Sequence, residues 1–574
     1  MSRLWREGLE ERLAVARGEA PAELVLTGAR VVNVFDHSLE ETSVAVHQGW
    51  VVGLGDYQGR ETHDLAGAYL APGFIEGHMH VESTMLCPAE LARAVAPRGT
   101  AVILADPHEI ANVLGAAGVA AMLAGSENLP VTFYFLAPSC VPASPLADSG
   151  AVLEAADLAE LAAHPRVVGL AEMMNFPGAA GGDPGVLAKL AAFHGRPIDG
   201  HAPLVSGKFL NAYLTAGPDS DHECAGLDEA REKLARGMWL MIRQGTSAHN
   251  LADLLPAVTP ATARRCLLVS DDRHPTTLAQ EGHLDDLLRR AVAQGLDPFT
   301  ALSLVTLNPA RRFGLAGRGA VAPGYVADLV VLEDLRDFRV RRTYQAGRLV
   351  ARDGRCLHPA DTPFPASARD SMHPGPLTPE LFRTPLGGGR VRIIELVPGQ
   401  LLTNQAVEEP PAAGGFLAAD PARDLALAVV LDRHHASGRR GLGLVRGLGI
   451  ISGALAASVA HDSHNLGVVG TDEASLLAAA TRVAEMGGGM AVAQEGRVLA
   501  SLALPLAGLM SAEPLERVAA GLAEVEAAAR GVCRLENPQM PLSFLSLEVI
   551  PHLKLTARGL VDVDRFAPVE LFLP

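Results

Sequence analysis

The sequence predicts an α/β protein in which a (β/α)8 TIM-type barrel is flanked by a small composite β-domain and followed by a separate C-terminal α/β or α+β domain. Three observations lead to this prediction. Short apolar runs alternate with Ala/Leu-rich helical stretches from about residue 72 to residue 315, similar β-branched runs lie before and after that part, and a proline-rich stretch follows. Such alternation is typical of βα units and a parallel sheet, and ~240 residues suit a barrel of eight units.

The expected domains can be placed in order along the chain. Residues 1–72 hold a charged leader and the runs "ELVLTGARVVNVF" and "SVAVHQGWVVGLG", which predict strands. The barrel is expected over 73–315, where "TAVILAD" precedes "EIANVLGAAGVAAMLAG" and "RCLLVSDD" precedes "HLDDLLRRAVAQG". Strand-like texture returns over 316–357, so we expect both ends to join in one small β-domain. A proline-rich linker over 358–379 precedes the C-terminal domain at 380–574.

Composition narrows the class of protein. With 574 residues, 48% of them hydrophobic, the chain is too long for one core and too apolar to be disordered. The formal net charge of −17 argues against a nucleic-acid polymer as partner. The six cysteines are scattered and form no CxxC pair, which indicates reduced thiols. No signal-peptide pattern or bilayer-length apolar stretch is present, so we expect a soluble, cytoplasmic protein without a membrane partner.

Ionisable residues stand where several predicted strands end. The stretch "GHMHVE" carries His78 and His80, whose spacing puts both imidazoles on one face of a strand. An isolated HxH is more typical of an ordinary turn, and each later residue, taken singly, is equally well a polar loop group. A barrel, however, builds its site at the carboxyl ends of its strands. The later residues are Glu172 in "VVGLAEMMN", His201 in "RPIDGHAP", His222 in "DSDHECAG", and Asp271 and Asp272 in "CLLVSDDRHP".

Together these side chains form a set of metal-ligand type. The set is His78, His80, Glu172, His201, His222 and Asp271. Borderline divalent metals take imidazole and carboxylate ligands, and six side chains exceed what one tetrahedral ion needs. With one carboxylate bridging, the set holds two ions, which share a water and make hydroxide available as a nucleophile.

Competing motifs fail on spacing. His80 and Glu82 begin an HxE pattern, but no PCxxC follows, which excludes the zinc nucleoside deaminase pattern. Two HE pairs, at His108 and His222, lack the second histidine of a zincin helix. The stretch "GLGLVRGLG" misses the GxGxxG spacing, and neither a P-loop nor a GxSxG elbow occurs.

The same stretches resemble a known family. "PGFIEGHMHVEST" is similar to the first metal-binding strand of the amidohydrolase superfamily, and within it the chain resembles the bacterial adenine deaminases. The resemblance rests on "GHMHVEST", "ADPHEIANVLG", "PSCVPA", "GLAEMMNFPG", "DGHAP", "SDHE" and "SDDRHP", and continues in "VAHDSHNLGVVG" and "LSFLSLEVIPHLKLT". Most amidohydrolases with two metals bridge them by a carboxylated lysine, whereas this family has a glutamate there, which Glu172 matches. Thr84 stands where serine is common.

The resemblance implies hydrolytic deamination of adenine to hypoxanthine and ammonia, by attack of a metal-bound hydroxide on C6 at a binuclear centre. By analogy, His78 and His80 bind one ion, His201 and His222 bind the other, and Glu172 bridges. Asp271 contacts a metal and carries the proton from the water to the leaving group. Asp106, His108 and Glu109 in "ADPHE" are candidates for purine recognition or proton transfer, and a helix N-cap or a proline-fixed turn explains them equally well.

The resemblance also implies cofactors and assembly. We expect two divalent ions per chain, Mn²⁺ first, with Fe²⁺ or Zn²⁺ as alternatives, and adenine as the small-molecule partner. We expect a homo-oligomer, either a dimer or a tetramer. For the stretch from His461 to Asn465, a polar loop that docks against the barrel or reaches over its mouth is favoured over a catalytic role.

Two other functions remain open on sequence grounds. One is another amidohydrolase, acting on a cyclic amide or an N6-substituted purine, which ammonia release from adenine would distinguish. The other is a barrel that has lost its metals and serves as a binding or assembly protein. That reading predicts gaps in the ligand set, and the set has none.

Overall fold

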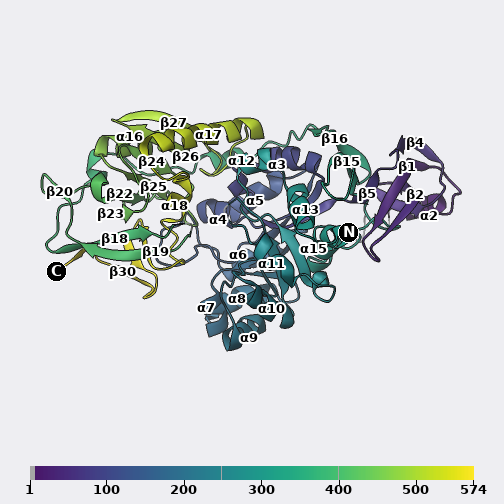
Figure 1. The fold of residues 1–574 in the computed structure, drawn as a ribbon, viewed down its shortest axis with the longest axis horizontal. Coiled ribbons are helices and arrows are strands. Elements are labelled where there is room, and N and C mark those ends of the chain that lie inside the picture. Colours follow the sequence, from purple (N-terminus) through teal and green to yellow (C-terminus); the bar gives the residue numbers. More distant parts are fainter. Residues whose placement is uncertain (1–6, 247, 399) are drawn as a thin grey trace.

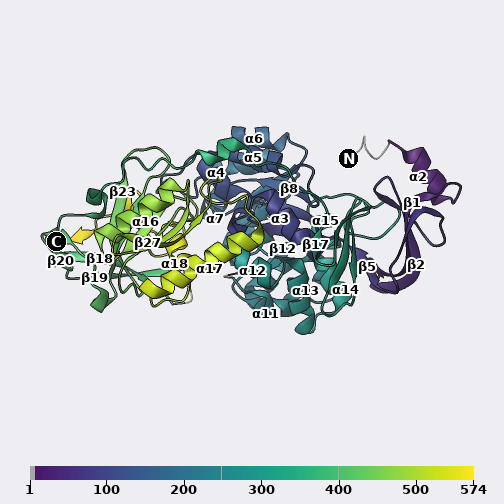
Figure 2. The ribbon, with the colours of Figure 1, turned by 90° about the horizontal axis from the view of Figure 1, so that it is seen from above.

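A computed structural model describes residues 7–246, 248–398 and 400–574. The chain is elongated and has three parts in a row (Figures 1 and 2). A β-sheet with the N-terminal strands lies at one end, an α/β part lies in the middle, and the C-terminal sheet with its helices lies at the other end. The middle part therefore contacts both of its neighbours along the row.

The first sheet combines strands from two distant stretches of sequence. Strand β5 (Tyr69–Pro72) pairs in parallel with β1 (Ala22–Asn33) and antiparallel with β14 (Leu329–Leu332). The sheet order is β17-β16-β15-β14-β5-β1-β2-β3, with β4 (Gly59–Asp64) beside β1. The other members are β2 (Ser38–His47), β3 (Trp50–Leu54), β15 (Val340–Gln345), β16 (Arg348–Arg352) and β17 (Arg355–Cys356). Residues 22–72 and 329–356 thus form one sheet.

The middle part is a TIM-like α/β domain with parallel strands in two sheets. The first has the order β10-β9-β8-β7-β6 and the second β11-β12-β13, and a parallel bridge between Met79 and Asp271 links the far ends. The strands are β6 (Phe74–Met79), β7 (Thr100–Ala105), β8 (Thr132–Ala137), β9 (Val167–Met173), β10 (Ile198–Gly200), β11 (Ser220–Asp221), β12 (Trp239–Arg243) and β13 (Cys266–Val269). Side chains from different strands, including Ile75, Leu104 and Leu267, share one buried cluster. The curled sheet therefore encloses an apolar core and brings the carboxyl ends of its strands to one rim.

Helices pack around this sheet, and along the chain they come between or after its strands. Helix α13 buries Leu284, Leu287, Leu288 and Ala291, an i, i+3, i+4, i+7 pattern that faces the core. Asp183 caps α8, accepting from the backbone N–H of Val186 at 2.9 Å. The helices include α3 (Pro88–Val95), α4 (His108–Leu114), α5 (Ala116–Gly125), α6 (Ala155–Ala162), α8 (Pro184–Ala192), α9 (Gly207–Ala216), α10 (Leu227–Ala235), α12 (Pro275–Gln280) and α13 (Leu284–Ala293).

The C-terminal region, residues 380–574, is built on a mixed sheet of the order β19-β18-β23-β22-β25-β24-β26-β27, with β31 (Phe572–Leu573) beside β18. Its strands are β18 (Arg390–Leu396), β19 (Thr403–Glu408), β22 (Ala426–Leu431), β23 (Arg440–Arg446), β24 (Ala454–Ala457), β25 (Leu466–Gly470), β26 (Gly489–Gln494) and β27 (Arg497–Ala503). Helix α16 (Glu473–Glu485) packs on β24–β27, and α17 (Leu515–Val532) packs on β26, β27 and α12. The short helix α18 (Gln539–Phe544) lies against β24 and β25. Helix α17 therefore joins this region to the middle part.

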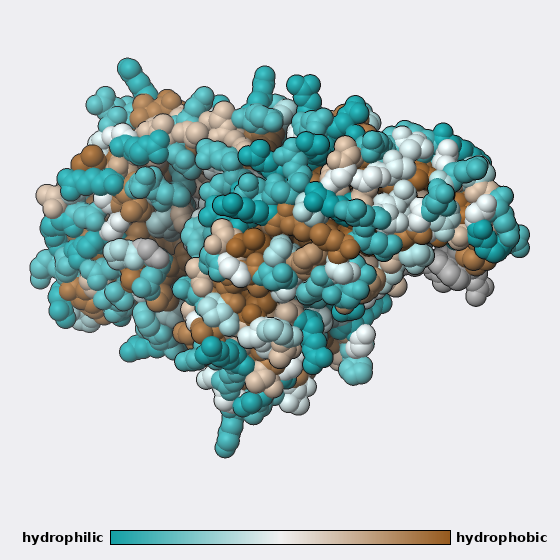
Figure 3. All heavy atoms as spheres, turned by 45° about the vertical axis from the view of Figure 1, so that its right-hand side comes forward, coloured by the Kyte–Doolittle hydropathy of each residue, from teal (hydrophilic) through white to brown (hydrophobic). Residues whose placement is uncertain are grey.

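The face shown in Figure 3 is mainly hydrophilic, and hydrophobic side chains gather over its middle. Within the part of the chain that the structure describes, the helices are all too short or too polar to cross a bilayer.

Candidate metal centre

The structure brings the six sequence-predicted ligands together at the rim of the curled sheet. His78 lies in β6, Glu172 lies in β9, and the other four lie one to two residues beyond the end of their strand. Five of the six are at most 4% exposed, namely His78, His80, Glu172, His222 and Asp271, and His201 is partly exposed. The site is therefore shielded from solvent on most sides and is open to solvent at His201.

Glu172 divides its two oxygens between two groups of imidazoles. Oε2 lies 2.6 Å from Nδ1 of His201 and 3.0 Å from Nε2 of His222. Oε1 faces the other way, 3.5 Å from Nε2 of His80 and 3.5 Å from Nδ1 of His108. Burial disfavours the charged carboxylate, but His201 and His222 outweigh it and hold the pKa of Glu172 well below its ordinary value. This is the arrangement that a bridging carboxylate requires.

Asp271 also presents its oxygens to different neighbours. Oδ1 lies 3.2 Å from Nε2 of His80 and 3.6 Å from Nε2 of His78, whereas Oδ2 accepts from Nη1 of Arg243 at 2.9 Å. Burial opposes ionisation, but the two histidines and Arg243 hold the pKa of Asp271 well below its ordinary value. Its backbone is left-handed, with φ at 54°, which is uncommon for a residue other than glycine. The fold thus keeps Oδ1 facing the histidines.

Two of the buried imidazoles of this set have ring nitrogens without a hydrogen-bond partner within the described residues. His78 and His222 stack with ring centroids 4.1 Å apart. In the described part of the chain, both ring nitrogens of His78 lack a hydrogen-bond partner. Nδ1 of His222 lacks one as well in that same part. Buried polar atoms of native proteins are normally satisfied, so these nitrogens are available to a ligand. Three groups of these side chains each place ligand atoms within 4.8 Å of one another: His78, His222 and Asp271; Glu172, His201 and His222; and His80, Asp106, His108 and Glu172. The donor set fits divalent metal.

The "ADPHE" stretch lies beside the centre, at the start of α4. Oδ1 of Asp106 accepts from the backbone N–H of His108 at 3.1 Å, and Oδ2 lies 3.3 Å from Nδ1 of the same histidine. The residue in the N-cap position is Pro107, so Asp106 holds the turn just before the helix. His108 is the member of this stretch that reaches Glu172, with the 3.5 Å contact given above.

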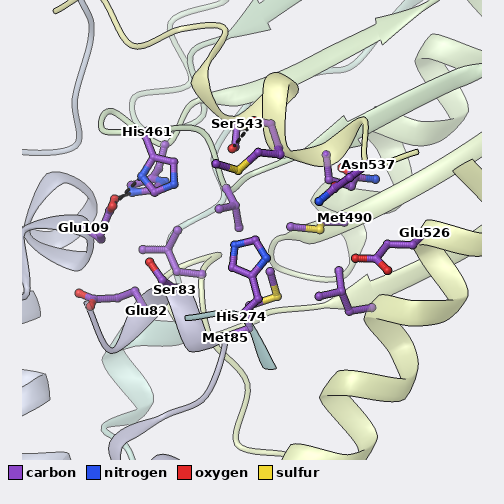
Figure 4. Close-up of a pocket in the computed structure, with 16 residues that line it drawn as sticks. Glu82, Ser83, Met85, Glu109, His274, His461, Met490, Glu526, Asn537 and Ser543 are labelled. Atoms are coloured by element: carbon purple, nitrogen blue, oxygen red, sulfur yellow. Dashed lines mark hydrogen bonds and ion pairs between the residues drawn. The ribbon is translucent and has the colours of Figure 1, made fainter. Parts of the chain in front are cut away.

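Glu109 joins the middle part to two histidines of the C-terminal region, and its contact with His461 is drawn in Figure 4. Its Oε1 lies 2.6 Å from Nδ1 of His461, and its Oε2 pairs with Nε2 of His464. The backbone N–H of Ala460 donates to Nδ1 of His464, so Nε2 carries the hydrogen and donates it to Glu109. No lone pair of His464 is then left for a metal. We therefore interpret this group, despite its metal-ligand composition, as a clamp between the two parts of the chain.

Buried charges behind the rim hold the ligand-bearing strands in place. Nζ of Lys233 donates to the carbonyl of Ala202 at 2.6 Å and to Oδ2 of Asp221 at 2.9 Å. Ala202 follows His201, and Asp221 precedes His222, so one ammonium ties both ligand positions together. The hydroxyl of Tyr213 adds to this by accepting from the backbone N–H of His201 at 3.1 Å.

Sequence reasoning missed three residues near the centre. Arg243 ends the apolar run of β12, which is the signal that identified the ligands, but a cation was not sought there. Asp199, whose Oδ2 lies 3.7 Å from Nδ1 of His78, sits within "RPIDGHAP" two residues before His201. Asp462 is buried in the C-terminal region, and burial raises its pKa to about 6, a shift that the charge of His108 opposes. The sequence places Asp462 in the stretch from His461 to Asn465, for which a loop that docks against the barrel or reaches over its mouth is favoured over a catalytic role.

Comparison with protein families and with known proteins gives matches to both halves of the chain. The model described as "Amidohydrolase family" matches residues 69–350, and the model described as "Adenine deaminase C-terminal domain" matches residues 400–567. The chain is similar to adenine deaminase 2 of Carboxydothermus hydrogenoformans, with 46% identity over 98% of this chain and 100% of that protein. It is 47% identical to the adenine deaminase of Syntrophobacter fumaroxidans, over 99% of each chain. The adenine deaminase of Dehalococcoides mccartyi is also 47% identical, over 97% of this chain and 98% of that one.

Proposed function

The chain belongs to the adenine deaminase family, and we propose that it hydrolyses adenine to hypoxanthine and ammonia at the centre described above. The resemblance seen in the sequence is thereby confirmed. In this reaction water adds at C6 of the purine, the bond from C6 to the amino nitrogen breaks, and the nitrogen leaves as ammonia. The observation that carries the proposal is Glu172, with one oxygen facing each of two imidazole groups.

The amidohydrolase family implies a divalent metal, and the residues present fit one. We propose two ions per chain, the first held by His78 and His80 and the second by His201 and His222. Glu172 would hold one ion with each of its oxygens, and Asp271 would contact one of the ions. Nitrogen and oxygen donors of this kind suit Mn²⁺, our first expectation, as well as Fe²⁺ and Zn²⁺. Two such ions lower the pKa of a shared water toward neutrality and so supply the nucleophile.

The chain's own side chains then move the protons. Oδ1 of Asp271 faces the centre and accepts the proton of the attacking water, while Arg243 holds Oδ2 and keeps the carboxylate in that orientation. The same carboxyl returns the proton to the departing amino group. His108 lies between Asp106 and Glu172, so we propose that it carries a proton or contacts the purine, with Asp106 orienting its ring. We place Glu109 in a supporting role, because both its oxygens are occupied by His461 and His464.

Glu172→Gln tests the proposal because it removes the bridging charge and nearly preserves the shape. We expect the metal content of Mn²⁺-reconstituted protein to fall from two ions toward one per chain, and most of the ammonia release from adenine to disappear. Elemental analysis and an ammonia assay on the same sample measure both. Glu333→Gln, at the surface beside Arg341, is the matched control and should leave both unchanged. Two tightly held ions with normal turnover in Glu172→Gln would refute the bridging role.

We further propose that the protein acts in the cytoplasm as a homo-oligomer, a dimer or a tetramer. Hydrophobic side chains gathered on the face shown in Figure 3 support association between copies. Light scattering after gel filtration measures the mass, and a monomer at micromolar concentration would contradict the proposal.

A further inference from the structure

A pocket lies between the rim of the middle part and the C-terminal region (Figure 4). Its wall on the side of the metal centre contains Glu82, Glu109 and His274. Each is close in sequence to a residue of the centre: Glu82 comes two residues after His80, Glu109 follows His108, and His274 comes three residues after Asp271. Oε1 of Glu109 lies 3.5 Å from Nε2 of His108, the histidine that contacts Glu172, so this wall borders the centre. The C-terminal region closes the pocket from the opposite side.

The walls of the pocket suit a flat aromatic ring. Three methionines line it, Met85 from the middle part and Met490 and Met540 from the C-terminal region, together with Leu509 and Leu522. Thioether side chains adapt their shape and make favourable contacts with aromatic rings. Binding sites for small molecules are typically apolar in this way, with a few polar groups that set the orientation of the ligand.

Gln539 is such a polar group. It lines the pocket at the start of α18 and is 6% exposed. Among the residues that the structure describes, neither Nε2 nor Oε1 of Gln539 finds a hydrogen-bond partner. An unpaired buried amide costs about 1–3 kcal/mol, so an amide with both atoms unpaired needs a partner from outside the chain.

We propose that Gln539 recognises the edge of adenine formed by N3 and N9–H, with Nε2–H donating to N3 and Oε1 accepting from N9–H. This inference rests on the proposed function, because deamination requires C6 and its amino group to face the metal centre. N3 and N9 lie on the opposite side of the purine, toward the C-terminal region. A primary amide offers an adjacent donor and acceptor, the same complementarity that lets Asn and Gln bind adenine bidentately in DNA.

The proposal assigns a function to the C-terminal region. It supplies the far wall of the substrate pocket and selects the free base, because a purine substituted at N9 lacks the hydrogen that Oε1 of Gln539 accepts. Sites built to bond a polar group of the substrate reject analogues that lack it. The Glu109 clamp, which fixes the loop with His461 and His464, holds this wall against the rim.

The test compares the metal-loaded wild type and a metal-loaded variant, each with adenine and with a substrate analogue. Gln539→Met keeps the length of the side chain and removes the amide, and 3-deazaadenine lacks the N3 acceptor. We expect kcat/KM for adenine to fall about 10- to 100-fold in Gln539→Met, the loss of two buried hydrogen bonds. The wild type should discriminate against 3-deazaadenine, and the variant should lose most of that discrimination. Hypoxanthine keeps N3 and N9–H and is not itself turned over. Its inhibition constant should therefore rise in Gln539→Met, in parallel with the loss of kcat/KM for adenine.

Gln294→Met is the matched control, because Gln294 carries the same amide, is exposed just after α13 and is not one of the residues that line the pocket. It should change each value less than about threefold, as is usual for a surface substitution. If Gln539→Met does not fold, Gln539→Leu carries the same expectations. Equal losses on adenine and 3-deazaadenine, or none, would overturn the role of Gln539. Absence of ammonia release from adenine by the metal-loaded wild type would instead refute the proposed function.

Discussion

Glu109→Gln weakens one defined contact between the middle part and the C-terminal region. Burial lowers the pKa of His461, but the charge of Glu109 outweighs it and raises that pKa to about 9 from an ordinary 6.5. His464 behaves differently: burial lowers its pKa to about 4, so it is a neutral donor. The variant therefore removes one buried ion pair and weakens one hydrogen bond.

The expected loss of stabilisation follows from the pKa shift of His461. A rise in the pKa of His461 from 6.5 to about 9 corresponds to about 3 kcal/mol of stabilisation of the charged form. A charged hydrogen bond contributes a similar ~1.5–3 kcal/mol. Because the folded-state pKa is raised, this stabilisation is fully present below pH 6.5 and is lost as the pH rises through about 9.

Hydrogen exchange of a peptide that covers residues 457–467 measures the effect. At pH 6 we expect protection in Glu109→Gln to fall about 100-fold relative to the wild type, the equivalent of ~3 kcal/mol for local opening. At pH 10 the two proteins should differ far less. Glu333→Gln removes a surface pair with Arg341 and should change exchange by no more than ~0.5 kcal/mol. Equal protection at pH 6, or a difference that persists at pH 10, would refute the reasoning.

Three further changes test other parts of the structure. Arg243→Gln frees Oδ2 of Asp271, so adenine turnover should fall about tenfold or more in steady-state assays, and unchanged turnover would contradict its orienting role. Lys233→Met leaves Asp221 buried and unpaired, so urea unfolding should show a loss of about 3–5 kcal/mol, whereas the exposed Lys208→Met should show almost none. Chelation of the metal should abolish activity and lower the melting temperature. Mn²⁺ at 100 times its Kd should restore about 2.7 kcal/mol of the free energy of unfolding. A melting temperature that does not change with metal would contradict the proposed centre.

The gathering of the six candidate ligands could be predicted from the sequence because its signal is local, whereas their binding of metal stays a prediction. His78 and Asp271 come at the end of apolar strands, and parallel strands of a curled sheet bring those ends to one rim. Any fold with this order of βα units therefore gathers the same side chains. The α/β character of the middle part follows from the same alternation. The domain boundaries expected from composition and the assignment of individual ligands to each ion stay predictions.

The contacts across the rim could not be predicted in this way. Glu109 and His461 are 352 residues apart, and their meeting depends on how α17 of the C-terminal region packs against α3 and α12 of the middle part. Arg243 carries the same strand-end signal as the ligands, yet only its contact with Asp271 shows what it does. Gln539 has an ordinary sequence context, and only burial reveals that its amide lacks a partner.

By itself, the sequence determined the six candidate ligands, because periodicity and strand-end chemistry depend on neighbours along the chain. Its resemblance to known proteins determined the family and the reaction class. The tertiary structure alone decided how Glu172 divides its oxygens, which side of Asp271 faces the histidines, and which wall the C-terminal region adds to the pocket. These features depend on distances between residues far apart in sequence, and such distances are set only when the separate cores pack together.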